Sequence, residues 1–376
     1  MKIKFMLAAL FLSALCPSLT AQKEVATLRV VTRLPSDIME SSGVAVTGSN
    51  LIWSHEDSGN ENKIFGFDTL GHLSRTITLT NASNVDWEDL ASDEDGNLFV
   101  ADLGNNSNTR TDLVIYKIPD PSTLTSNSVA AEELRVTFAD QTAFPPPPPG
   151  RNFDVEAVLW HQGSLFLFTK DRSEPFSGIT KMYKLADQPG TYLLMPEATL
   201  FTGSDPNTDR VTSADCNRAT GEMVLLTHNR LISFTHYPSD RFFEGTMREY
   251  FFNTLPGQNE AIAFVTSKKL YMTEEGASGT GGHLYQVTLP SATGIPSGFA
   301  AGWSLSPNPA SDCIRVEAPV SSCRLHITLV GITGTVVLET HVVAGEPIPV
   351  AALPSGCYLA VALLGQQVVR LPFVKL

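Results

Sequence analysis

Five acidic residues recur along the chain in similar surroundings and together could bind a cation. Each stands beside a short apolar run, and a turn then leads into a second run that ends in polar or charged residues. The five residues are Glu40, Glu88, Glu156, Asp215 and Glu260. Calcium prefers oxygen ligands such as carboxylates, and converging carboxylates cannot all stay ionised without a cation, a proton or a basic partner. The pattern therefore predicts a hard-cation site, with calcium as the first candidate.

The same carboxylates have a structural alternative. An acidic side chain at the start of a strand can accept backbone N–H groups from a neighbouring repeat and hold the two repeats together. Such a contact would be needed at every junction, so the recurrence fits this role as well as it fits metal binding. Both interpretations stay open at the level of the sequence.

The ends of the second runs differ from repeat to repeat, as expected of a single asymmetric ligand site. These ends contain Glu56, Asp57, Asp102, Lys170, His228 and Glu274. Asn105, Asn106 and Arg110 lie in the loop after Asp102 and could bind ligand oxygens. Lys170 and His228 are the candidates for acid–base catalysis, with an ordinary structural histidine as the alternative for His228.

The elements around these residues have the pattern of β-strands, because apolar and polar side chains alternate between Gly, Pro and Asp turns. The five repeats begin 45 to 68 residues apart, a spacing that accommodates one four-stranded sheet each. The fifth repeat lacks a fourth strand, which residues 25–34 can supply. We therefore predict that residues 22–289 form an all-β propeller of five blades, or six if a degenerate blade lies within a long repeat, closed by the N-terminal strand.

The start of the chain and its net charge predict export and exclude some partners. Lys2 and Lys4 precede an apolar run, residues 5–16, that is too short to span a bilayer, and residues 1–21 therefore have the pattern of a signal peptide. A net charge of −13 makes nucleic acid an unfavourable partner. The motifs of the common nucleophile and cofactor classes do not occur in the sequence.

A linker of small residues, 290–302, leads to a unit of residues 303–376 whose short runs predict a small β-sandwich. Four motifs follow in order: SPNPA from residue 306 with Asp312, GITG from residue 331, LPSGCY from residue 353 and FVK from residue 373. In these motifs the unit resembles the type A sorting domain of type IX secretion cargo, although Gly331 and Thr335 depart from the family's usual residues. The resemblance implies recognition of residues 303–376 by the type IX secretion machinery. It also implies an extracellular location, secreted or attached to the outer-membrane surface.

The repeats resemble secreted bacterial β-propellers, including phytase-like and esterase-like domains, in their acid-Ser-Gly, Asp-Trp-Glu-Asp and Glu-Ala openings. The function that we expect is a propeller that binds a glycan, a protein or a small ligand, with a calcium ion in an acidic channel. One alternative is a metal-dependent hydrolase of phosphoesters or lactones. Another is a structural surface protein without a small-molecule site.

Overall fold

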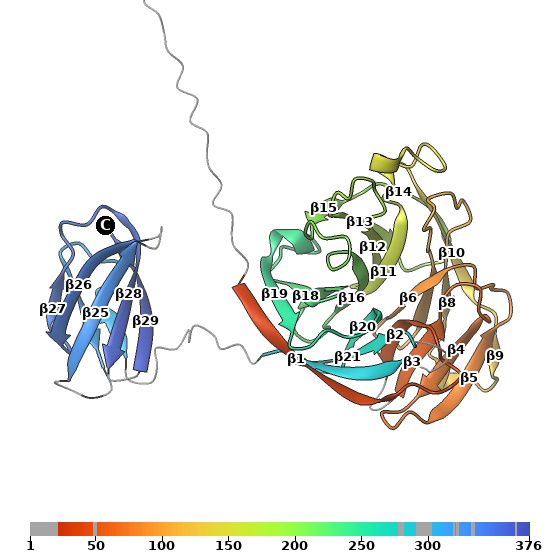
Figure 1. The fold of residues 1–376 in the computed structure, drawn as a ribbon, viewed down its shortest axis with the longest axis horizontal. Helices are drawn as coiled ribbons and strands as arrows, with labels where there is room; N and C mark the ends of the chain where they lie inside the picture. The colour runs from red at the N-terminus through yellow and green to blue at the C-terminus, as the bar shows by residue number, and fades with distance from the viewer. Residues whose placement is uncertain are drawn as a thin grey trace, which may run out of the picture. The chain divides into compact units, whose positions relative to one another are not determined.

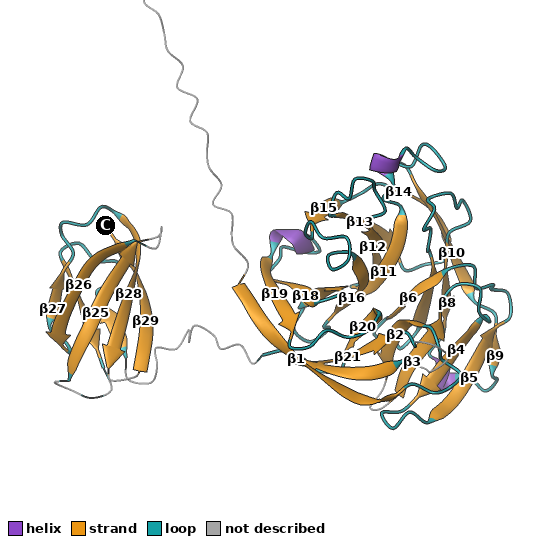
Figure 2. Cartoon of the chain, viewed as in Figure 1, coloured by secondary structure: helices purple, strands orange, loops and turns teal. Residues whose placement is uncertain are grey.

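A computed structural model describes residues 22–47, 51–276, 282–290, 303–318, 320, 323–331, 335–364 and 367–376. Its contacts divide the chain into an N-terminal unit, Met1–Pro290, and a C-terminal unit, Ser291–Leu376. The predicted signal peptide and most of the predicted linker lie outside the described residues. Strands dominate both units, and the helices in the described ranges are three short 3-10 turns, Pro121–Thr123, Pro148–Gly150 and Phe242–Glu244 (Figure 2). Over these ranges the chain forms no helix of the length and hydropathy that a bilayer crossing requires.

The described strands of the N-terminal unit form sheets of eight, five, four and five strands, within which each sequence repeat contributes an antiparallel set of four. Repeat one contains β2 (Ser41–Thr47), β3 (Leu51–Glu56), β4 (Lys63–Phe67) and β5 (Leu73–Leu79), and repeat two contains β6 (Trp87–Ser92), β7 (Leu98–Asp102), β8 (Val114–Ile118) and β10 (Glu132–Phe138). Repeat three contains β11 (Asp154–His161), β12 (Ser164–Lys170), β13 (Ile179–Ala186) and β15 (Ala198–Phe201). Repeat four contains β16 (Val211–Cys216), β17 (Met223–Thr227), β18 (Arg230–Thr235) and β19 (Thr246–Phe252). Repeat five contains β20 (Asn259–Phe264), β21 (Lys269–Glu274), β22 (His283–Thr288) and β1 (Gln22–Arg33).

The N-terminal strand β1 completes the fifth repeat and joins it to the fourth. Residues 27–33 of β1 pair antiparallel with β22, and residues 22–26 pair parallel with β19. The innermost strands β2, β6, β11, β16 and β20 contact one another in a closed ring and lie around one centre in Figure 1. The all-β propeller with an N-terminal closing strand is thus confirmed.

Two short strands that the sequence pattern did not reveal extend the outer edges of the first two repeats. β9 (Ser128–Val129) pairs parallel with β5, and β14 (Gly190–Leu194) pairs parallel with β10. Each comes from a long connection that returns to an earlier edge. They cover edges that would otherwise expose unpaired backbone groups.

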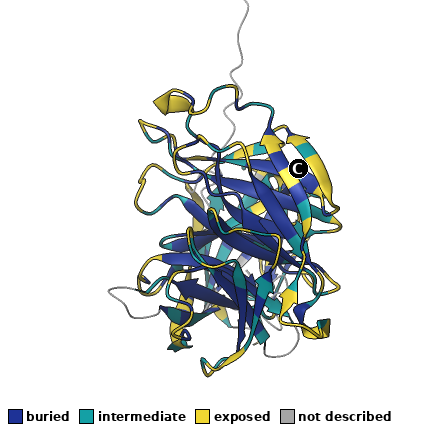
Figure 3. Ribbon diagram, turned by 90° about the vertical axis from the view of Figure 1, so that its right-hand side faces the viewer, coloured by how far each residue is buried: buried dark blue, intermediate teal, exposed yellow. Residues whose placement is uncertain are grey.

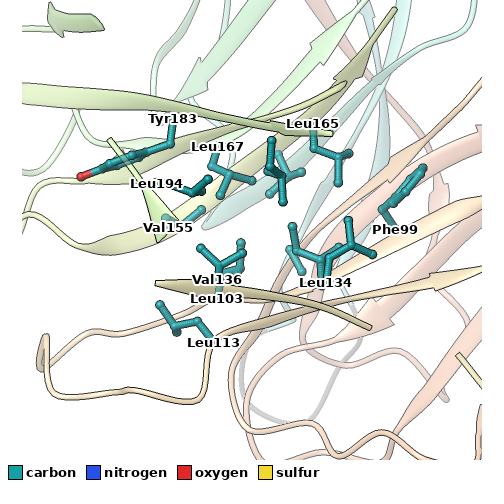
Figure 4. Close-up of a cluster of buried hydrophobic side chains, with 14 of the residues drawn as sticks. Phe99, Leu103, Leu113, Leu134, Val136, Val155, Leu165, Leu167, Tyr183 and Leu194 are labelled. Atoms are coloured by element: carbon teal, nitrogen blue, oxygen red, sulfur yellow. The ribbon is translucent and has the colours of Figure 1, made fainter. Parts of the chain in front are cut away.

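The apolar core lies between neighbouring repeats, because both faces of an inner sheet are covered. Buried residues accordingly follow the strands, while the loops are largely exposed (Figure 3). Figure 4 shows the cluster between repeats two and three, to which Phe99, Leu134, Val155, Leu165 and Leu167 contribute. Burying an aliphatic or aromatic side chain of this size contributes about 1.5–3 kcal/mol. These clusters hold the inner strands, and therefore the polar residues on them, in place.

The C-terminal unit contains two antiparallel sheets that share one apolar core. The smaller sheet contains β23 (Ser304–Ser306), β24 (Cys313–Glu317) and β27 (Pro347–Pro349). The larger contains β26 (Val336–Val343), β25 (Arg324–Gly331), β28 (Gly356–Leu364) and β29 (Gln367–Lys375). Ile314 and Ile348 of the smaller sheet belong to the same buried cluster as Ile327 and Leu371 of the larger. This is the arrangement of a small β-sandwich.

Candidate functional site

The first strand of every repeat carries one residue more than its partner strand can pair. The register of each pair shifts at one end, as in a β-bulge, which redirects a side chain relative to the regular strand alternation. The residues at these shifts are Ser42, Glu88 with Asp89, Glu156, Thr212 and Glu260. Because the five innermost strands form a ring, the bulges bring polar side chains from different repeats to the same end of the central channel.

A cavity of about 220 Å³ lies at this end of the channel. Its lining consists of Ser42, Asp57, Glu88, Asn106, Glu156, Lys170, Arg172, Gln258, Glu260 and Glu275. Every one of these residues is polar or charged, and five of them are acidic against two that are basic. Sites for organic ligands are usually lined by apolar and aromatic side chains. The cavity therefore suits an ion or a very hydrophilic group.

The basic side chains of the cavity are already paired with carboxylates of β11. Lys170 Nζ lies 2.8 Å from Glu156 Oε2. Arg172 bridges two carboxylates, with Nε 2.5 Å from Asp154 Oδ2 and Nη2 2.8 Å from Glu156 Oε1. Burial alone would lower the pKa of Lys170, but the charges of Glu156 and Glu260 outweigh it and hold the pKa above its usual range. Lys170 is therefore a permanent cation at neutral pH.

Glu88 and Glu260 form no direct ion pair among the described residues, and the charge of Lys170 acts on them only from a longer distance. Each is only 6% exposed, lines the cavity and accepts no hydrogen bond from any residue in the described ranges. Burial, followed by the charges of Glu156 and Asp154, raises the pKa of Glu88 well above its ordinary value. A buried carboxylate without a partner is costly. A proton or a bound cation at these two side chains would therefore neutralise their buried negative charge.

Carboxylate oxygens of Asp57, Asp86 and Glu88 lie within 4.8 Å of one another, close enough to ligate a single ion. Burial, with added repulsion from neighbouring carboxylates, raises the pKa of Asp57 to about 7 and also raises that of Asp86. The Asn106 side-chain amide lies 3.5 Å from Asp86 Oδ2. The carboxyl groups of Glu88 and Asp86 can lie this close to the backbone of residue 104 because it is a glycine. A Cβ at Gly104 would collide with both carboxyl groups.

Two of the five predicted cation ligands lie elsewhere. Glu40 precedes β2, is exposed and accepts a hydrogen bond from Asn60 Nδ2 at 2.8 Å. Asp215 lies near the far end of β16, where its carboxylate accepts the backbone N–H of Phe264 at 2.6 Å and lines a different cavity of about 600 Å³. The ring of five carboxylates is therefore wrong. Asp215 instead has the structural role considered as the alternative, since it binds the backbone of the next repeat.

The reason for this error is the position of the bulges. The residues equivalent to Glu88 are Ser42 in repeat one and Thr212 in repeat four, neither of which is acidic. Glu88, Glu156 and Glu260 all line one cavity. The register shift that sets the equivalence has no signature in the sequence of a single strand.

The residues predicted at the ends of the second strands divide into those that line the cavity and those that support the fold. Asp57 and Lys170 line it. Glu56 accepts the backbone N–H of Met39 at 2.8 Å. Glu274 is buried among the Gly257 N–H, the Tyr285 hydroxyl and His283, and its neighbour Glu275 reaches the cavity instead. His228 follows β17 and is not among the lining residues, so its predicted catalytic role is not supported.

The loop after Asp102 is also mainly structural. Asp102 is buried and pairs with Arg110 Nη1 at 2.8 Å, and Arg110 Nε pairs with Asp112 at 3.0 Å. The Asn105 side chain is buried and accepts the N–H groups of Thr109 and Arg110. Of the three loop residues predicted to bind a ligand, Asn106 alone is exposed at the cavity.

Sequence reasoning missed several residues at or beside the cavity. Arg172 and Gln258 line it, and Asp86 contributes to the carboxylate group of Asp57 and Glu88; each stands within two residues of a position that the repeats had marked. A search for further charged residues next to the candidate site residues would have found Asp86 and Arg172. Asp86 lies in the Asp-Trp-Glu-Asp segment that contains Glu88, and Arg172 lies two residues after Lys170. Ser42 carries no comparable signal, because a serine in a strand is ordinary.

Comparison with known proteins adds little to this picture. No family model matches the chain, and no curated protein matches it. A gluconolactonase from Xanthomonas campestris is 13% identical, with a TM-score of 0.38 over 66% of this chain and 72% of that one. The PQQ-bound aldose sugar dehydrogenase from Streptomyces coelicolor is 10% identical, with a TM-score of 0.44 over 70% of this chain and 98% of that one. Likenesses this distant say nothing about the ligand, so function has to be inferred from the cavity itself.

Proposed function

We propose that the N-terminal unit is a binding propeller that holds one divalent cation, calcium first, in its axial cavity. The observation that carries this proposal is that Glu88 and Glu260 are buried in the cavity without a hydrogen-bond partner among the described residues. Asp57, Asp86 and Glu88 would supply oxygen ligands to the ion. Calcium takes about six to eight oxygen ligands, so further positions would be open to water or to an oxygen of a bound glycan, protein or small ligand.

The proposal is tested by thermal unfolding of the chelated protein with added calcium. Calcium at millimolar concentration should raise the Tm of the wild type, because binding to the folded state alone stabilises it. Glu88→Gln should abolish most of this shift, because it keeps the shape of the side chain and removes its charge. Glu94→Gln is the control, since Glu94 is exposed in the hairpin turn between β6 and β7. An unchanged Tm of the wild type in calcium would refute the proposal.

The hydrolase alternative is less well supported by the cavity. Lys170 is held as a cation by Glu156, and His228 does not line the cavity, so neither is placed as a general base. A general base must lie within hydrogen-bond reach of the proton that it removes. We expect no turnover on a panel of phosphoesters and lactones with calcium or magnesium present. Turnover that Glu88→Gln abolishes would favour the hydrolase.

Export by the type IX secretion system remains a proposal from the sequence motifs of residues 1–21 and 303–376. In a host with this system, the full chain should reach the medium or the outer cell surface. Deletion of residues 303–376 should leave the protein in the periplasm. Export that is unaffected by this deletion would contradict the proposal.

A further inference from the structure

Two carboxylate triads share Glu88, and each combines residues that line the cavity with one, Asp86 or Asp154, that stands beside it. In the first, oxygens of Asp57, Asp86 and Glu88 lie within 4.8 Å of one another, and in the second the same is true of Glu88, Asp154 and Glu156. By geometry alone each triad could hold a cation, and together they could hold two ions bridged by Glu88. The surroundings of the two triads are very different, however.

The second triad already has two side-chain cations. Arg172 contacts both Asp154 and Glu156, at 2.5 and 2.8 Å, and Lys170 contacts Glu156 at 2.8 Å. Both basic residues come from the end of β12 and the loop that follows it. Arginine does not lose its charge in proteins and pairs two carboxylate oxygens in a fixed geometry. The negative charge of Asp154 and Glu156 is therefore compensated by the protein itself.

No basic side chain in the described ranges lies within ion-pair distance of the first triad, and the charges of Arg110 and Lys170 act on Asp86 and Glu88 only from farther away. None of the ion pairs in these ranges includes Asp57, Asp86 or Glu88. Glu88 is also one of the two buried cavity carboxylates, with Glu260, that accept no hydrogen bond from the described residues. The polar groups that contact the triad are neutral: the Ser58 backbone N–H donates to Asp57 Oδ1 at 2.6 Å, and the Asn106 amide lies 3.5 Å from Asp86 Oδ2.

We propose that Lys170 and Arg172 are internal counter-ions that fill the second triad, so that the cavity takes one divalent cation, at Asp57, Asp86 and Glu88. This inference rests on the proposed function and adds the reason why the chain would bind one cation and not two. The ammonium group of Lys170 lies 2.8 Å from Glu156 Oε2 and so binds a carboxylate oxygen that a second ion would need. Its charge also repels such an ion across a few ångströms.

The test is the number of calcium ions bound per chain, measured by calorimetric titration and by metal analysis after gel filtration. The variant is Lys170→Met, which leaves Arg172 as the single positive charge among the described residues in contact with the second triad, so that its three carboxylates retain negative charge for a second ion. The control is Lys181→Met, because Lys181 forms a comparable half-buried pair with Asp140 at 2.6 Å and does not line the cavity. Wild type, Lys181→Met and Lys170→Arg should bind one ion each, and Lys170→Met should bind two.

The outcomes separate this inference from the proposed function. A wild type that binds no calcium refutes the proposed function. A wild type that binds two ions, or a Lys170→Met variant that binds one ion with unchanged affinity, refutes the counter-ion role alone. If Lys170→Met is unfolded without metal, calcium should restore its fold, because the ion replaces the lost ammonium group. A variant that stays unfolded in calcium overturns the inference.

Discussion

Replacing Gly104 by alanine would place a methyl group among the carboxylates of the proposed cation site. The new Cβ would lie 2.5 Å from Asp86 Oδ2 and closer still to Glu88 Oε1, whereas ordinary contacts begin at 3.4 Å. Both carboxyl groups would have to move by about 1 Å. Because the colliding atoms are at the ends of side chains, the cost in unfolding free energy should be small, about 1 kcal/mol or less without metal.

The affinity for calcium should change much more than the stability. A shift of about 1 Å moves two ligands out of a coordination sphere whose bond lengths are about 2.3–2.6 Å. Losing a group that only orients a ligand costs about 10–100-fold in affinity, so Gly104→Ala should weaken binding by at least tenfold, or about 1.4 kcal/mol. Urea unfolding in chelator and calorimetric titration with calcium measure the two effects. Gly150→Ala is the control, since its Cβ would meet only Pro146 Cβ at 3.7 Å. Wild-type calcium affinity in Gly104→Ala would refute the placement of the site.

Three further predictions concern the framework of the site. Arg110→Met leaves the buried Asp102 without its ion pair and should cost about 3 kcal/mol or more in urea unfolding, with calcium stoichiometry unchanged in the protein that remains folded. Gly43→Ala puts a Cβ 2.8 Å from the backbone N of Leu90 in the neighbouring repeat, and should lower the unfolding free energy by about 1–3 kcal/mol; no loss would mean that the inner strands are less tightly packed. Burial raises the pKa of Asp215 from 3.8 to about 6, so the folded state keeps a proton that the unfolded state loses in this window, and stability falls as pH rises through it. Asp215→Asn should flatten that slope by about 1.4 kcal/mol per pH unit, and an identical slope in both proteins would contradict the assignment.

Much of the strand architecture could be predicted because the physical cause is local. Alternating or continuous apolar runs between turn residues indicated strands throughout the repeats, and the structure has strands such as β7 and β19 at these runs. The missing fourth strand of the last repeat pointed to β1, since an open edge is unfavourable. β14 could not be predicted in the same way, because it is held by pairing with β10 from an earlier repeat and lies largely exposed.

The candidate site was predicted only in part, because its geometry depends on register. Aligning the repeats by their acidic residues placed Glu40 and Asp215 with Glu88, whereas the bulges align Ser42 and Thr212 with it. The sequence also did not indicate which carboxylates form ion pairs with basic side chains. Arg172 is distant in sequence from Asp154 and Glu156, and only the folded hairpin of β11 and β12 brings it onto both.

A crystal structure of the N-terminal unit soaked in calcium would test the central claim most directly. We predict one ion in the axial cavity, bound at about 2.3–2.6 Å by carboxylate oxygens of Asp57, Asp86 and Glu88, with Lys170 still on Glu156. A cavity without an ion at saturating calcium, or an ion bound by other residues, would contradict it.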